Sequence, residues 1–166
     1  MRHIIGILLQ NESGALNRVA GLFTNRGFNI ESLSVAATDD PTVSRITLVT
    51  QGSDQVVHQI VSQLNKLIDV VNVDDMTRGE HVERELALVK VKVRGDRRAA
   101  AVAAVQQAGG KLLGTSGDLI IAELTANESE VTAFIGEIAA KGDLVEVVRS
   151  GALALARDGR TLRVVQ

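Results

Sequence analysis

The sequence predicts an α+β protein built from two βαββαβ sandwiches in tandem, each a four-stranded antiparallel sheet with two helices on one face. Three observations predict this class. Apolar runs suited to strands alternate with amphipathic segments suited to helices, and their order repeats in the second half of the chain. A glycine follows the first helix of each half, at Gly27 and Gly109. The 166 residues leave room for two units of about 80 residues each.

In the first half, strands are expected at 3–10, 29–37, 43–50 and 70–76, and helices at 14–25 and 54–67. The first helix has one apolar stripe, formed by Leu16, Val19, Ala20 and Phe23. Its expected N-cap is Ser13 and its expected C′ residue is Gly27. The second helix starts after Ser53 and its apolar face is expected to hold Val57, Ile60, Val61, Leu64 and Ile68.

The second half repeats this order, with strands expected at 84–93, 111–115, 118–125 and 144–150. One helix is expected after Asp96 and runs to Ala108, and the other begins after Asn127. Asn127 and Glu130 have the spacing of a capping box, and the apolar stripe that follows consists of Val131, Phe134, Ile135 and Ile138.

These patterns divide the chain into a first domain at 1–77, a polar linker at 78–83, a second domain at 84–158 and a tail at 159–166. The chain from Ala152 onward alternates apolar residues and contains the turn signal Asp158-Gly159. It is therefore expected either to add a hairpin to a sheet edge or to be partly disordered.

Composition excludes several classes of function. The formal net charge is -2 with scattered Lys and Arg, and aromatic residues make up only 2% of the chain, which argues against nucleic-acid binding. The chain has no cysteine, and its three histidines lack a shared helical spacing, so no metal site is expected. The apolar run Ile4–Leu9 is too short for a signal peptide or a membrane span. A cytoplasmic protein without membrane association is expected.

A candidate ligand site lies in the loop Asn11-Glu12-Ser13-Gly14, between the first strand and the first helix. Gly14 would let a carboxylate approach the amides of Gly14, Ala15 and Leu16 at the positive end of the helix. Asn29 is expected to converge with Asn11, and two carboxamides suit a zwitterion such as a free amino acid. The alternative is that these residues only cap and turn the chain.

The strand Ile30–Ala37 is expected at the edge of the first sheet, with Ser32, Ser34 and Ala36 on one face. Because this edge carries little charge after Glu31, it is open to pairing with a second copy of the chain. Ser34 and Ala36 would then lie at the dimer seam near the ligand site. The alternative is an edge that a loop covers.

No catalytic residue is predicted. An acid–base enzyme would have to use Asp39, Asp40 or the carboxylates within 83–85, but alternating charges at a strand entry are typical of a solvated face. A ligand-responsive transcription factor would need a basic reading helix, and none is evident. Regulation by ligand binding is the function that these residues favour.

The strings LLQNESGALNRVAGLFTNRGFNIESLSVAATDDPTVSRITLVTQG and HVERELALVKVKV closely resemble the small, regulatory subunit of acetolactate synthase (acetohydroxyacid synthase). The resemblance runs from about Arg2 to Val148 and is looser from Arg94 to Ala126. It implies two ferredoxin-like domains, of which the first is an ACT domain that binds valine as a feedback inhibitor at a homodimer interface.

Carried over by motif, the valine contacts would be Asn11, Gly14, Ala15 and Leu16 in the first loop, with Asn29 and Ile30 across the seam. The resemblance implies no cofactor in this chain. It implies a catalytic subunit as partner, which holds thiamine diphosphate, FAD and magnesium and which the small subunit both activates and makes sensitive to valine. The alternative is an ACT-type amino-acid sensor that regulates another enzyme or a transcription complex.

Overall fold

A computed structural model of the chain describes residues 1–164. They form two compact units. The first unit comprises Met1–Val82 together with the C-terminal segment from Ala152, and the second comprises Glu83–Gly151. The second unit is therefore an insertion, in sequence, between two parts of the first.

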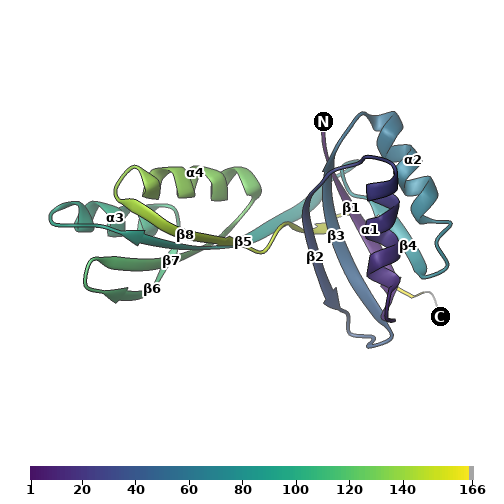
Figure 1. The fold of residues 1–166 in the computed structure, drawn as a ribbon, viewed down its shortest axis with the longest axis horizontal. Helices are drawn as coiled ribbons and strands as arrows, with labels where there is room; N and C mark the ends of the chain where they lie inside the picture. The colour runs from purple at the N-terminus through teal and green to yellow at the C-terminus, as the bar shows by residue number, and fades with distance from the viewer. Residues whose placement is uncertain (165–166) are drawn as a thin grey trace. The chain divides into compact units, whose positions relative to one another are not determined.

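The first unit has the predicted βαββαβ order. Its elements are β1 (Arg2–Gln10), α1 (Ala15–Asn25), β2 (Ile30–Ala37), β3 (Val43–Gln51), α2 (Asp54–Leu64) and β4 (Val70–Asp75). The strands are antiparallel neighbours in the order β2-β3-β1-β4, so β2 is an edge strand as predicted. Both helices cover one face of this sheet, which we call the inner face (Figure 1).

The core of the first unit lies between the inner face and the two helices. Strand residues alternate between faces, so Ile5, Ile7 and Leu9 of β1 all point toward the helices. They pack against buried residues of α1 and α2, namely Ala15, Val19, Phe23, Val57, Ile60 and Leu64. Leu16 is not among them and is 39% exposed, because Ala15 takes the buried position in the first turn.

Helix α2 is shorter than its apolar pattern predicts. The pattern predicts a helix to residue 67 with Ile68 on its apolar face, but the helix ends at Leu64 and Ile68 is 86% exposed. Asn65 is the C-cap residue, and the chain turns there toward β4. Periodicity alone does not detect such an ending, because apolar residues continue past it.

The opposite, outer face of the first sheet is also covered, and this is why almost all of β1 is buried. Ile4, Val49 and Met76 on that face form a separate cluster with Ala152 and Ala154, and Leu162 packs against it. The segment contains a short strand, β9 (Leu153–Ala156), which pairs with β5 (His81–Lys92). Within residues 152–164 the C-terminal segment thus adds one strand and no hairpin, and it packs across a sheet face.

The second unit repeats the fold, which confirms the predicted class. Its elements are β5 (His81–Lys92), α3 (Arg97–Gln107), β6 (Lys111–Ser116), β7 (Leu119–Ala126), α4 (Glu128–Ala139) and β8 (Asp143–Arg149). The sheet order is β6-β7-β5-β8, with α3 and α4 on one face (Figure 1). The capping box is confirmed: the Asn127 side chain accepts from the Glu130 amide, and the Glu130 carboxylate accepts from the Asn127 amide.

Val89, Val91 and Phe134 belong to the core of the second unit, which is aliphatic apart from that one ring. Among residues 1–164, no helix is long and apolar enough to cross a membrane.

Candidate effector loop

The loop that follows β1 is fixed to the hairpin between β2 and β3. The Asn11 amide donates to the Thr42 carbonyl at 2.8 Å, and the Asn11 side-chain Nδ2 donates to the Pro41 carbonyl at 3.0 Å. These two bonds orient the Asn11 side chain, and its Oδ1 remains available as an acceptor on an exposed residue. Asn11 is therefore held in place at the surface, as a ligand contact requires.

Gly14 opens α1 and replaces the predicted cap. It is the N-cap residue with a φ of 87°, in the left-handed region, so Ser13 does not cap the helix and that prediction is wrong. As a glycine, it offers no side chain to accept from the first-turn amides. A side chain at position 14 would be strained, and its Cβ would lie 3.3 Å from Nη1 of Arg18.

The first-turn amides are only partly free. The Ala15 amide donates to the Glu12 carbonyl at 3.2 Å, which corrects the expectation that it faces a ligand. The amides of Leu16 and Asn17 follow in the first turn, where helix geometry provides no intrahelical acceptor. With Gly14 lacking a side chain, the positive end of α1 is open to a small anion at this point.

An ion pair holds the beginning of α1 to the residue that precedes β4. Arg18 donates through Nε to Oδ2 of Asp69 and through Nη2 to Oδ1, the second at 2.8 Å. This hydrogen bonding lowers the pKa of Asp69 and raises the pKa of Arg18. The Asp69 carbonyl also accepts from the Gln10 amide at 2.8 Å, so Asp69 braces both ends of the loop.

Asn29 and Ile30 lie at the other end of the same sheet. The Asn29 carbonyl accepts from the Thr50 hydroxyl at 2.6 Å, and Thr50 is paired with His3 at the start of β1. Asn11 follows the end of β1. The expectation that Asn11 and Asn29 converge within one chain is therefore wrong: β1 and β2 run in the same direction, so the start of one lies far from the end of the other.

The candidate seam lies on β2. Among residues 1–164 this strand pairs only with β3, so its other edge is free. Ser34 is half-buried and Ala36 is exposed on it. Val35 is 40% exposed, although it shares a strand face with Leu33, which packs on the core. An exposed edge strand with aliphatic side chains and little charge is suited to pairing with another strand.

Two of the carboxylates that an enzyme could use, Asp40 and Glu85, have structural roles instead. Asp40 accepts from the Thr42 hydroxyl at 2.6 Å and from its amide at 2.9 Å, and these bonds lower the pKa of Asp40. Glu85 is buried and accepts two hydrogen bonds from Arg149, at 2.8 and 2.6 Å. A carboxylate with a lowered pKa in a turn is a poor general base.

A four-stranded βαββαβ sheet with two helices on one face is the fold of an ACT domain, the class to which the first unit belongs. Residues 5–72 match the family model of the acetohydroxyacid synthase (AHAS) small subunit-like ACT domain. Residues 84–158 match the family model described as the small subunit of acetolactate synthase.

Similar proteins match almost the full length of the chain. It is 44% identical over 163 residues to the acetolactate synthase isozyme 3 small subunit of Escherichia coli, covering 98% of this chain and 100% of that one. It is 41% identical to a probable acetolactate synthase small subunit of Archaeoglobus fulgidus, covering 96% and 99%. The crystal structure of the acetolactate synthase small subunit from Thermotoga maritima superposes with a TM-score of 0.86 at 34% identity, covering 96% and 99%.

The chain therefore belongs to the acetolactate synthase small-subunit family, the regulatory and non-catalytic subunits of that enzyme. This confirms the resemblance that the NESGAL and HVERE strings carry.

Proposed function

We propose that the first unit binds valine at a seam between two copies of the chain, and that valine thereby inhibits a separate catalytic subunit. The observation that carries this proposal is the helix start at Gly14, which lacks a capping side chain and lies beside the fixed carboxamide of Asn11. An uncapped helix start normally recruits water or an anion, and a carboxylate suits it.

The strand directions support a homodimer in which each site is shared. Asn29 precedes β2, whereas the hairpin at 38–42 follows its end and is bonded to Asn11. If two copies pair antiparallel through β2, the start of one β2 comes beside the end of the other. Asn29 and Ile30 of the partner subunit would then approach the Asn11 loop, which they cannot do within one chain.

The chemistry of the loop fits a small branched amino acid. The valine carboxylate would accept from the Leu16 amide and its first-turn neighbour, and the ammonium would donate to carboxamide oxygens of Asn11 and the partner subunit's Asn29. The isopropyl group would pack near exposed aliphatic residues such as Leu16. Burying that group contributes about 1.5–3 kcal/mol, so the polar ends must supply much of the affinity. Leucine and isoleucine would bind more weakly, by about 1–3 kcal/mol.

The partner that family membership supports is the catalytic, large subunit of acetolactate synthase. In this proposal that subunit carries thiamine diphosphate, FAD and magnesium, and this chain supplies activation and valine sensitivity. A coupling free energy of about 1–3 kcal/mol between the valine site and the catalytic centre would suffice for inhibition. The alternative is an ACT-type sensor of another enzyme or of a transcription complex. The full-length match to acetolactate synthase small subunits favours the acetolactate synthase partner.

Titration calorimetry with valine tests the proposal, on the chain alone and with the catalytic subunit. We expect saturable binding by the wild type, and loss of binding in Asn11→Ala. The matched control is Asn25→Ala, which removes an exposed carboxamide at the opposite end of α1 and should leave binding unchanged. Absence of valine binding to the wild type, or equal binding by all three chains, would contradict the proposed site.

A further inference from the structure

After Gly151 the chain leaves the second unit, and the described residues 152–164 pack back on the first unit. We call this segment the strap. Its apolar contacts are made by Ala152, which is 2% exposed, by Ala154 and by Leu162, all against the outer face of the first sheet. The strap therefore starts where the second unit ends and lies on the unit that carries the candidate valine site.

A glycine in β1 leaves space on the outer face of the sheet for a residue of the strap. Gly6 lies in the middle of β1, where glycine weakens a strand, and a Cβ there would lie 2.7 Å from Cδ1 of Leu162 and 2.9 Å from Cε of Met76. The missing side chain leaves the space that Leu162 occupies. A side chain at position 6 would therefore collide with the docked strap and with Met76, both on the outer face of the sheet.

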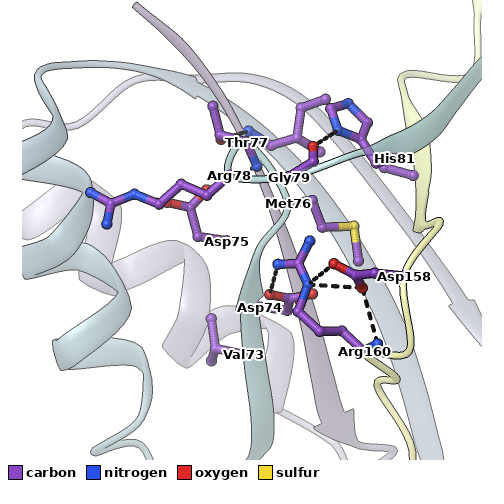
Figure 2. A network of polar contacts seen from close by, with 12 residues as sticks. Val73, Asp74, Asp75, Met76, Thr77, Arg78, Gly79, His81, Asp158 and Arg160 are labelled. Carbon is purple, nitrogen blue, oxygen red and sulfur yellow. Dashed lines mark hydrogen bonds and ion pairs between the residues drawn. The ribbon is translucent and has the colours of Figure 1, made fainter.

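Polar contacts fix the strap at three places. Arg160 donates through Nη1 to Asp74 of β4 at 3.0 Å and through Nε to Asp158 at 2.8 Å (Figure 2). The Arg157 amide donates to the Glu80 carbonyl at 2.9 Å. Nη2 of Arg45 on β3 donates to the Ala154 carbonyl at 2.9 Å.

The strap contributes no residue to the helical-side core of the first unit, so its detachment would leave that core packed. Leu153 and Leu155 are 53% and 64% exposed on the strap's other face. A cavity of about 770 Å³ lies beside it, bounded by Leu155, Leu162 and the 38–40 part of the hairpin. A segment held by two small buried side chains and a few polar contacts can open at a lower free energy than that of global unfolding.

Two contacts connect the strap to the candidate valine site. The hairpin that bounds the cavity also holds Asn11 through Pro41 and Thr42. Arg45, which binds the strap, is in register with Ala36 on the candidate seam strand. A shift of the hairpin or of β2 on the binding of valine would therefore change the contacts of the strap.

We infer that the strap is a conformational device: its docking on the outer face responds to valine and passes the response to the second unit through Ala152. This inference rests on the proposed function, because it names the element that the effector acts on. By reciprocity, valine must change the stability of the docked strap if the strap changes the response to valine.

The first measurement is amide hydrogen exchange of residues 152–164 in the wild-type chain, with and without saturating valine. We expect valine to change the exchange rate of the Arg157 amide and its neighbours. Unchanged exchange in a chain that calorimetry shows to be saturated would overturn the inference and leave the proposed function intact. A wild-type chain that binds no valine would overturn both.

The second measurement is valine inhibition of the holoenzyme reconstituted with strap variants. Leu162→Ala removes the anchor, and Leu155→Ala makes the same change at an exposed position of the same segment. We expect Leu162→Ala to raise the valine concentration for half inhibition by about 5- to 150-fold, with Leu155→Ala matching the wild type. Arg160→Gln, which removes the ion pair with Asp74 and no residue of the apolar cluster, should shift it in the same direction by a smaller factor. Identical inhibition curves for all four proteins would overturn the inference.

Discussion

Gly14 determines the geometry of the candidate effector loop because only glycine adopts its backbone conformation without strain. Its φ of 87° begins α1 without a side-chain cap, and the Arg18 guanidinium lies directly beside the position of the missing Cβ. A carboxylate on residue 14 would therefore reach the same positive region that we assign to the carboxylate of the ligand.

We expect Gly14→Asp to abolish the valine response while leaving activation of the catalytic subunit intact, because the new carboxylate occupies the anion position and pairs with Arg18. Gly14→Ala is the control for backbone strain. It should destabilise the first unit by about 1–2 kcal/mol yet retain valine binding, since it adds no charge. Normal valine titration of Gly14→Asp holoenzyme would refute the placement of the carboxylate.

Asp69 gives the first unit a dependence on acid. Its folded-state pKa is lowered by hydrogen bonds from Arg18, so its contribution to stability is fully present above the unfolded value, about 4, and is lost as the pH falls through the folded value. We expect the difference in unfolding free energy between the wild type and Asp69→Asn to be constant above about pH 4 and to shrink below it. Urea unfolding from pH 3 to pH 7 measures this, and parallel pH profiles of the two chains would disprove the role of the pair.

At the scale of elements, β2 is the feature with the clearest functional consequence. It is an edge strand with one neighbour among the described residues, and Ala36 on it is exposed beside Arg45 in the register of β3. Valine favours strands more than alanine does, so Ala36→Val should not destabilise an isolated unit.

We expect Ala36→Val to weaken dimerisation and the valine response, because the added methyl groups crowd a seam that fits alanine. Overpacking costs about 1–3 kcal/mol, which corresponds to a rise in the dimer dissociation constant of about 5- to 150-fold. Analytical ultracentrifugation with and without valine measures it. The same dissociation constant in both chains, with the same inhibition curve, would exclude Ala36 from the seam.

Most elements could be predicted from the sequence because local signals determine them. The capping box at Asn127 and the apolar stripe of α4 were sufficient to place that helix, and the βαββαβ order was sufficient to predict β2 as an edge. Helix ends were less predictable. Ser13 has the favoured side chain for a cap, but Gly14 takes the role because its left-handed backbone starts the helix one residue later.

Relations between distant elements could not be predicted in the same way. The placement of Asn29 depends on strand direction. Strands β1 and β2 both pair antiparallel with β3 and therefore run the same way, so Asn11 after β1 and Asn29 before β2 lie at opposite ends of the sheet. The strap depends on a fit between Gly6 and Leu162, which are separated by most of the chain. Neither residue stands out from its sequence neighbours, and hydrophobic periodicity carries no information on such pairs.

At the scale of the whole molecule, the division of the chain into units makes one prediction about stability. Removing residues 152–166 would uncover Ile4, Val49 and Met76, each 2–3% exposed. Each large apolar side chain fully returned to water costs about 1.5–3 kcal/mol, so the first unit should lose a few kcal/mol while the core of the second is untouched.

Calorimetric melting of the full chain and of the shortened chain checks this. The control is the core substitution Val89→Ala, which should destabilise the second unit and leave the first unchanged. We expect the deletion to lower the melting temperature of the first unit alone and to increase binding of a hydrophobic dye. Identical melting of the two chains would show that the strap adds nothing to the first unit.

The return of the chain to its first unit also has a consequence for biosynthesis. A ribosome releases Ile4 and Val49 long before it has translated Leu162, and the inserted second unit is completed in between. The nascent first sheet therefore exposes its apolar outer face until Leu162 has been synthesised. Transiently exposed apolar surface is prone to aggregation, so we expect this face to be the part of the nascent chain most in need of protection.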